Sequence, residues 1–294
     1  MIAQFYRNSL GSRIFDVSII MILCFFAILT LYPLIYTITL SLQEANVLNN
    51  NFYLWPEKFT INAYRGILKD RIFWKCYFNT IFYVMSNVLV CLTLTLTTAY
   101  PLTVRDFPLR NFLMFFITFT MLFSGGLIPY YLLIKRLGFV NTIWVMIIPG
   151  ALSAYYVILT RTFIQSSIPI SLREAAMLDG ANEFFIFSKI ILPLSKPIIA
   201  VIALFQAVGV WNNWFTPMIF LSDRKLFPVA LYLQEIVVGS LQQTQQLTAE
   251  LKATVSPTSV RCATLIVVIV PIMCVYPFLQ KYFVKGVMIG AIKE

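Results

Sequence analysis

The sequence predicts an all-α membrane protein with six transmembrane helices, and three properties of the chain lead to this fold class. Of its 294 residues, 60% are hydrophobic and only 12% are charged. A soluble domain has about a quarter of its residues charged, so this chain has too little polar surface to cover a water-soluble globule. Finally, the apolar residues gather in long runs, and about 20 such residues cross the hydrocarbon core as a helix.

Each predicted helix is built around a run that contains no Asp, Glu, Lys or Arg. The first run resembles a secretory signal in its position, but it is too long for one, and we expect it to stay in the protein as a helix. We see no internal repeat and no linker, so we predict one domain over residues 1–294. The approximate spans are residues 14–42, 77–104, 111–134, 138–162, 197–222 and 261–281.

Several functional classes do not fit the composition. The formal charge is +10, but the basic residues are scattered between apolar runs and form no nucleic-acid motif. The sequence has no histidine, which removes imidazole catalysis, imidazole metal sites and histidine proton relays. Its five cysteines form no CxxC pair, and we interpret them as packing residues. We therefore expect no metal site and no catalytic residues.

The predicted spans also lack the groups that energise transport. No Asp, Glu or Lys lies in mid-membrane, which argues against coupling to an ion gradient. The sequence contains no GxxxxGK[ST] phosphate-binding loop. If the chain transports a solute, the energy must come from a partner. The Lys and Arg residues divide evenly between the two faces, so their distribution does not give the orientation.

The segment of residues 167–196, between the fourth and fifth spans, has the strongest local signals. Ser171 and Glu174 fit an S-x-x-E capping box at the start of a short helix. Asp179 and Gly180 predict its end, with Gly180 suited to a left-handed conformation. Asn182 is then placed to cap a second helix that runs from Glu183 to Leu192.

A helix of about eight residues is marginal in water, so this one makes most sense if it docks onto a partner. Ala175 and Ala176 have small side chains that would let a partner backbone approach closely. The alternative interpretation is an ordinary connecting loop, and the helix ends alone do not decide between the two.

The same segment carries a longer pattern, E-A-A-x3-G-x9-I-x-L-P. It resembles the EAA loop of bacterial ABC importer permeases of the type I fold. The stretch from Glu174 to Pro197 looks like the carbohydrate-uptake, maltose-transporter-like branch, and residues 123–129, 141–144 and 276–286 are similar to LplC/YtcP-type permeases. The pattern is met by Glu174, Ala175, Ala176, Gly180, Ile190, Leu192 and Pro193.

The resemblance implies a permease subunit of an ABC importer for a carbohydrate, with an oligosaccharide as the implied solute. It implies a second, homologous permease, two ATP-binding cassette ATPases, a solute-binding protein and membrane lipid as partners. The chain itself would bind no cofactor, because ATP and Mg²⁺ would be held by the ATPases. The EAA loop would face the cytoplasm of a bacterial cell, with both termini on that side of the inner membrane.

In the family, the EAA loop is the helix that couples the permease to its ATPase. Glu174 has two interpretations that stay open, a capping role or an ion pair with the ATPase. The tail from Gly286 to Glu294 resembles one that reaches the ATPase interface. The resemblance places ATPase coupling at Ser171, Arg173, Glu174, Ala175, Ala176, Leu178, Asp179, Gly180 and Phe187.

A substrate pathway is suggested by amide and aromatic side chains in the fifth span, because amides bind hydroxyl groups and aromatic faces stack on sugars. The alternative is that the tryptophans belong to an interfacial belt and the amides bridge helices. Weaker candidates lie earlier in the chain. The full set is Ser124, Gly125, Tyr155, Gln206, Trp211, Asn212, Asn213 and Trp214.

Three alternative functions remain at this point. The chain could be an ABC permease for a solute other than a sugar. It could be an ion-coupled secondary carrier, although the charges and repeats of that class are not visible. A membrane-embedded transferase would require clustered His, Asp or Glu, and the acidic residues are scattered.

Overall fold

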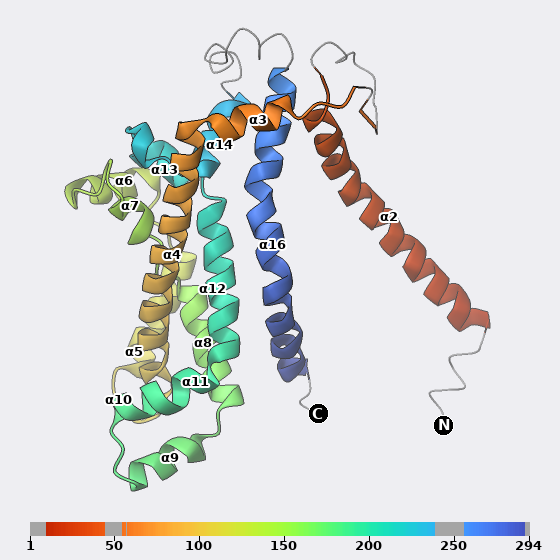
Figure 1. Ribbon diagram of the computed structural model, residues 1–294. Helices are drawn as coiled ribbons and strands as arrows, with labels where there is room; N and C mark the ends of the chain where they lie inside the picture. Colours follow the sequence, from red (N-terminus) through yellow and green to blue (C-terminus); the bar gives the residue numbers. More distant parts are fainter. Residues whose placement is uncertain (1–9, 45–54, 57, 239–255, 292–294) are drawn as a thin grey trace. The chain divides into compact units, whose positions relative to one another are not determined.

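We analysed a computed structural model, which describes residues 10–44, 55–56, 58–238 and 256–291. The described chain is helical, as the composition predicts (Figure 1). The helices are α2 (Leu10–Ser41), α3 (Asn62–Lys69), α4 (Arg71–Ala99), η2 (Pro101–Thr103), α5 (Arg110–Leu122), α6 (Leu127–Arg136), α7 (Trp144–Ile147), α8 (Ala154–Ser167), α9 (Ile170–Leu178), α10 (Glu183–Phe185), η3 (Ile186–Ile191), α11 (Leu192–Leu194), α12 (Lys196–Trp211), α13 (Phe215–Phe220), η4 (Arg224–Leu226), α14 (Val229–Val238) and α16 (Pro257–Ala291).

Three of the described helical segments are long and apolar enough to cross a membrane unbroken. They lie at Ile14–Ser41, Arg71–Thr103 and Pro257–Cys274, and they match the first, second and sixth predicted spans. Counting two bent helix pairs as one span each raises the total to five among the described residues. The count of six stays a prediction.

The third predicted span, residues 111–134, is not one straight helix. It consists of α5 and α6, whose axes differ by 117°. The break falls at Gly126, which has a φ of 82°. This left-handed conformation is accessible to glycine at little cost but interrupts helical geometry. The sequence pattern shows the apolar run but not this turn.

The fourth and fifth predicted spans are also interrupted. Between α7 and α8 the chain leaves the helical path near Gly150, which has a φ of 75°. In the fifth span, α12 ends at Trp211 and α13 begins at Phe215. At its other end α12 meets the preceding helical segment, Glu183–Leu194, at an angle of 75°. The prediction of a continuous helix was therefore wrong within the fourth and fifth spans, whereas the 75° bend lies before the fifth span.

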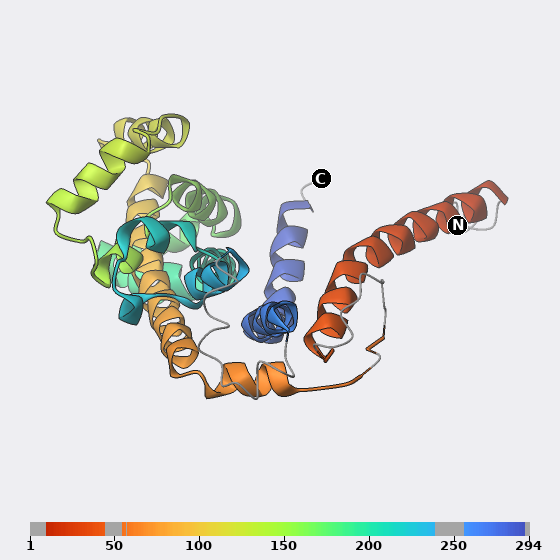
Figure 2. The ribbon, with the colours of Figure 1, turned by 90° about the horizontal axis from the view of Figure 1, so that it is seen from above.

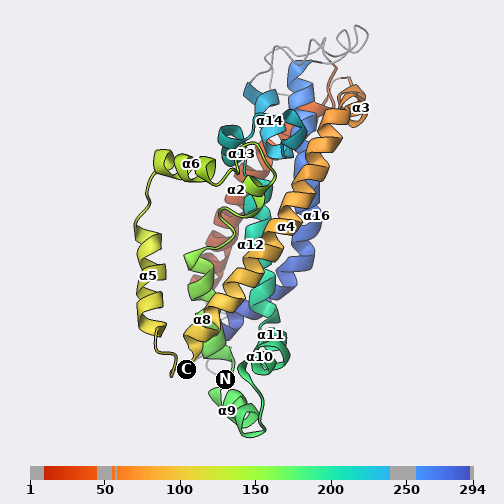
Figure 3. The same cartoon turned by 90° about the vertical axis from the view of Figure 1, so that its left-hand side faces the viewer.

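The chain divides into two compact units, which are described separately. The larger comprises residues 71–235 and 268–294, and its core is formed by α4, α8 and α12. These three helices run alongside one another in two perpendicular views (Figures 1 and 3). Cys91 of α4 is fully buried there against Ile198 and Ile202 of α12. Seen from above, α6 extends outward from this bundle (Figure 2).

The smaller unit comprises residues 1–70 and 236–267. Its polar contacts gather where α2 ends. The hydroxyl groups of Ser41 and Tyr64 lie 2.7 Å apart, and the Ser259 hydroxyl donates to the backbone carbonyl of Gln43 at 3.0 Å. Buried hydroxyl groups are stable only when they are hydrogen-bonded, so these contacts fix α3 and the start of α16 to the end of α2.

Candidate functional site

Helix α9 begins two residues earlier than the sequence predicts. Pro169 occupies the N-cap position with φ −61° and ψ 135°, and the helix starts at Ile170. Ser171 therefore lies inside the first turn, and no side chain caps this helix end. Proline disfavours a helical conformation in the residue before it, which explains the extended conformation of Ile168 and the end of α8 at Ser167. The predicted capping box of Ser171 and Glu174 is wrong.

The end of α9 confirms the prediction for Gly180. Gly180 has a φ of 81°, and its N–H donates to the carbonyl of Met177 at 3.1 Å. The next amide, that of Ala181, donates to the carbonyl of Ala176 at 2.9 Å. These two bonds form a Schellman motif, which satisfies the last carbonyls of a helix. Asp179 is the C-cap residue that precedes this turn.

Asn182 caps the next helix, as predicted. Its side-chain oxygen accepts the N–H of Phe185 at 2.8 Å. The helical path then runs through α10, the π-helical segment η3 and α11, and it ends at Leu194. The sequence predicts one helix to Leu192 and does not indicate a π-helical segment, which is rare in proteins and frequent near functional sites.

The two sides of α9 have different surroundings. Ala176 is buried, with 8% of its surface exposed, and Arg173 one turn earlier is partly covered. By contrast, Leu178 is 90% exposed and Met177 is 49% exposed. The remaining predicted coupling residues of this helix and its cap are exposed, namely Ser171, Glu174, Ala175, Asp179 and Gly180.

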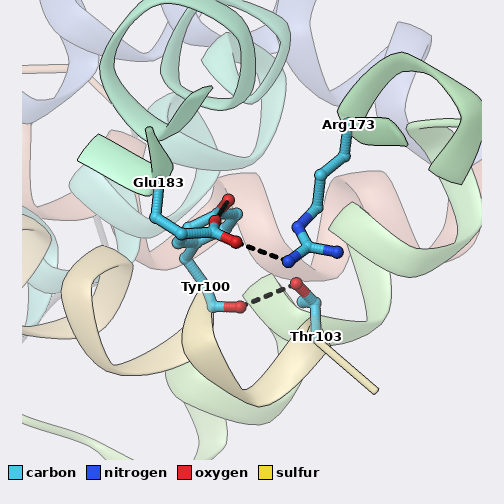
Figure 4. Close-up of polar contacts among 4 residues, drawn as sticks. All are labelled: Tyr100, Thr103, Arg173 and Glu183. Atoms are coloured by element: carbon cyan, nitrogen blue, oxygen red, sulfur yellow. Dashed lines mark hydrogen bonds and ion pairs between the residues drawn. The ribbon is translucent and has the colours of Figure 1, made fainter. Parts of the chain in front are cut away.

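Arg173 makes a polar contact that the sequence does not predict (Figure 4). Its guanidinium donates to one carboxylate oxygen of Glu183, in α10. The hydroxyl of Tyr100, directly after α4, donates to the other oxygen of the same carboxylate. The hydrogen bond with Glu183 raises the pKa of Arg173 above its usual range. Desolvation alone would raise the pKa of Glu183, but the hydrogen bonds from Arg173 and Tyr100 lower this pKa below its usual value.

A small apolar cluster lies next to this polar contact. Tyr100, Ala176 and Ile186 are buried in it, and the partly buried Phe187 packs against them. The ring centroids of Tyr100 and Phe187 are 5.3 Å apart. The family resemblance assigns Phe187 to coupling. In the structure its side chain packs against the apolar cluster that holds the buried side of α9.

Sequence reasoning missed Tyr100 and Glu183. Tyr100 lies in the second predicted span, and Glu183 was noted only as the first residue of a helix. A carboxylate in the first turn of a helix is already explained by its favourable interaction with the helix dipole. The sequence therefore gives no reason to expect that Glu183 also pairs with Arg173, ten residues earlier. No local pattern indicates the contact with Tyr100.

In the bundle, Gln206 joins a network around Asn87 of α4. The Gln206 amide nitrogen donates to the side-chain oxygen of Asn87 at 2.6 Å and to the carbonyl of Gly150 at 3.2 Å. The Asn87 amide donates to the carbonyls of Met146 and Ile147 at 3.2 and 3.0 Å. Asn87 is 2% exposed. Gln206 thus bridges helices, which was the alternative interpretation of this amide.

The other candidates in and after α12 have mixed surroundings. Trp211 is buried, and its ring lies edge-on to that of Tyr77 at a centroid distance of 5.7 Å. Asn213 bonds locally, accepting the Thr216 N–H at 3.1 Å and donating to the Thr216 hydroxyl at 3.0 Å. Asn212 and Trp214 are exposed.

The earlier candidates are exposed. The hydroxyl of Ser124 accepts the N–H of Gly126 at 3.3 Å, so it supports the turn between α5 and α6. Gly125 lies in the same turn. Tyr155, at the start of α8, is 51% exposed. The structure does not gather these residues with Gln206 into one site, and the substrate pathway stays a prediction.

No group of three or more His, Cys, Asp or Glu side chains among the described residues is arranged to hold a metal ion. The cysteines of the described chain are free thiols; Cys76, Cys91 and Cys262 are buried. The predicted tail falls on α16, which extends to Ala291, while residues 1–9 and 292–294 lie outside the described residues.

Curated relatives match the chain over nearly its full length. The protein LplC of Bacillus subtilis is 37% identical over 289 residues, which cover 98% of this chain and 97% of LplC. The polygalacturonan/rhamnogalacturonan transport system permease protein YtcP of the same organism is 37% identical over 284 residues, covering 96% of this chain and 99% of YtcP. These similarities confirm the branch that the sequence motifs indicate.

A solved structure has the same fold. It is a crystal structure of a bacterial ABC transporter involved in the import of the acidic polysaccharide alginate, and one of its chains is 33% identical. The TM-score is 0.87, and the match covers 94% of this chain and 99% of that one. Residues 92–289, which include α9 and the whole Arg173 contact, match the family described as the inner membrane component of binding-protein-dependent transport systems. The chain therefore belongs to this family, as a non-catalytic membrane subunit of an ABC transporter.

Proposed function

We propose that this chain is the permease subunit of an ATP-driven importer for an oligosaccharide, and that α9 docks onto a separate ATPase subunit. The observation that carries the docking proposal is the two-sided character of α9. Ala176 faces the chain's own core, while Leu178 is 90% exposed. An exposed apolar side chain on a well-anchored short helix is suited to insertion into a groove on a partner.

Docking of this kind would let ATP move the membrane helices. ATP draws two ATPases together, and each carries the α9 helix of its own permease with it. The permeases then change between an arrangement open to one side of the membrane and one open to the other. ATP can drive this change only because it binds one arrangement better than the other.

The proposed assembly follows from the family description, which itself names a binding protein. It comprises this chain, a second homologous permease, two ATPases that hold ATP and Mg²⁺, and a solute-binding protein outside the membrane. In this assembly α9 and both chain ends face the cytoplasm of a bacterial cell.

The solute class rests on the relatives. YtcP is named for polygalacturonan and rhamnogalacturonan transport, and the solved transporter imports alginate. An oligosaccharide is therefore the proposed solute. Of the aromatic candidates, Tyr155 and Trp214 are 51% and 39% exposed and can present ring faces to a sugar, whereas Trp211 is buried.

Replacing Leu178 tests the docking. The variant Leu178→Glu puts a charge on the exposed side of α9 and removes no internal contact, so the permease should still fold. We expect its affinity for the ATPase to fall about tenfold or more, as for other central interface residues. Co-purification of the ATPase with the permease pair in detergent measures this. Leu109→Glu is a matched control, because Leu109 is 55% exposed and lies outside α9. Equal recovery of ATPase with both variants would contradict the docking.

The solute is tested separately, on the solute-binding protein that co-operates with this permease. Titration calorimetry with oligogalacturonides, alginate oligosaccharides and neutral oligosaccharides should show binding to at least one class. Binding of a non-sugar solute with no response to any oligosaccharide would remove the carbohydrate from the proposal and leave the docking at α9 untouched.

A further inference from the structure

The polar contact around Glu183 connects three segments that are separate in the sequence. Tyr100 follows α4, Arg173 lies in α9, and Glu183 is the first residue of α10. The two oxygens of the Glu183 carboxylate each accept one donor, the Tyr100 hydroxyl and the Arg173 guanidinium (Figure 4). One carboxylate therefore holds α9 and the end of α4 at the same time.

The apolar cluster next to this contact fixes the same elements. Arg173 and Ala176 are three residues apart and lie on one side of α9. Ala176 packs in the cluster with Tyr100 and Ile186. Residues on both the polar and the apolar part of the contact thus point from α9 toward the chain's own core.

Glu183 also connects the contact to α12. It begins the helical segment Glu183–Leu194, which leads into α12 across the 75° bend. Tyr100 connects the contact to α4 through one peptide bond from Ala99. Since α4 and α12 pack together in the core at Cys91, Ile198 and Ile202, both helices of that pair are attached to α9.

We infer that Tyr100, Arg173 and Glu183 form a clamp that positions α9, so that a displacement of α9 is passed to α4 and α12. This inference rests on the proposed docking of α9 to the ATPase. A helix of nine residues has little stability of its own. Without the clamp, α9 could tilt on its partner while the membrane helices stay in place.

If the contact only stabilised the fold, its removal would lower the thermal stability of the assembly. The Glu183 side chain is 50% exposed, and ion pairs with exposed members contribute little to global stability. The clamp variants should therefore leave the thermal stability of the assembly nearly unchanged. What they should change is the transmission of movement from α9.

The test uses the whole transporter, with both permeases and both ATPases, in lipid nanodiscs. Hydrogen exchange is compared before and after trapping with ATP and vanadate, at residues 170–182 of the coupling segment and at residues 96–104 of the α4 end. Arg173→Gln and Glu183→Gln remove the charges of the clamp with little change in size. Tyr100→Phe removes only the hydroxyl and keeps the ring that packs on Phe187.

We expect the variants to assemble with the ATPase and to exchange about fivefold faster than wild type at residues 170–182 without nucleotide, because local opening needs fewer contacts to break. In these variants, the difference in hydrogen exchange before and after trapping should persist at residues 170–182 and be reduced severalfold at residues 96–104. Arg173→Lys keeps the charge and should restore most of the difference at residues 96–104. Lys189→Gln is the control, since Lys189 is an exposed cation of the same segment.

The outcomes distinguish a failure of the docking proposal from a failure of the clamp. If the wild-type chain does not assemble with the ATPase, the docking fails and the clamp fails with it. If the wild type assembles and the clamp variants transmit the change to residues 96–104 as Lys189→Gln does, only the clamp is wrong. Loss of assembly in Arg173→Gln and Glu183→Gln, with a monodisperse permease pair and with assembly retained in Arg173→Lys, supports positioning. Loss of the folded permease pair in all three clamp variants overturns it in favour of a structural role.

Discussion

Ala175 and Ala176 are chemically identical neighbours with different surroundings. The sequence predicts that both let a partner backbone approach closely. Ala176 is buried against the chain's own core, while Ala175 is exposed. A side chain on a helix turns by about 100° with each residue, so adjacent alanines cannot both face the same partner. The small size of Ala176 brings α9 close to its own supporting cluster, and only Ala175 remains open to a partner.

Gly180 allows a prediction at the scale of one residue. Its φ of 81° is unfavourable for β-branched residues, while no atom lies within 4 Å of a Cβ built there. Gly180→Val should therefore destabilise the end of α9 by about 1–2 kcal/mol through the backbone alone. Asparagine accepts this conformation more readily, so Gly180→Asn should lose less. Hydrogen exchange at the amides of Gly180 and Ala181 measures both. Equal protection in the two variants would show that the positive φ is not needed in solution.

At the scale of elements, α4 and α12 are joined by polar as well as apolar contacts. Asn87 uses its amide to bind the carbonyls of Met146 and Ile147, where the chain leaves α7. Gln206 adds a bond from α12. Unbonded carbonyls in a membrane interior are costly, so this network permits the interruption between α7 and α8. The sequence shows Asn87 only as one amide within an apolar run.

Removing this network should lower stability in a non-additive way. Asn87→Leu leaves two carbonyls without this donor and removes one of the two acceptors of the Gln206 amide, so it should cost about 1 kcal/mol, as for interhelical hydrogen bonds in membranes. Gln206→Leu should cost less, because Asn87 keeps both carbonyl bonds. Unfolding of the permease pair in detergent gives the values, and the double variant should cost less than the sum. Thr97→Val, at an exposed position of α4, is the control. Strict additivity would mean that the two amides are not coupled.

At the scale of the whole molecule, much apolar surface lies outside the chain's own core. No residue of α5 is buried, and this helix exposes large apolar side chains such as Phe112, Phe115 and Leu122. In a membrane protein such surface is covered by lipid or by other subunits. A chain built in this way is suited to act as one part of an assembly, in agreement with its family.

The whole-molecule prediction concerns ATP hydrolysis. The sequence has no phosphate-binding loop, so the purified chain in nanodiscs should release phosphate from ATP only at the background rate. Assembly with the proposed second permease and two ATPases should give vanadate-sensitive hydrolysis. A complex whose ATPases carry an inactivating substitution is the control for contaminants. Hydrolysis by the isolated chain would contradict its assignment as a non-catalytic subunit.

The sequence by itself determined the membrane class, the family motif, and the turn at Gly180 and cap at Asn182, because each depends on composition or on residues a few positions apart. Only the tertiary structure decided which side of α9 faces inward, where the predicted spans break, and that Glu183 binds Tyr100, 83 residues away. The physical reason is the separation along the chain between the groups that interact. A cap or a left-handed turn is fixed by its own backbone, whereas a hydrogen bond between distant segments exists only after the helices have packed.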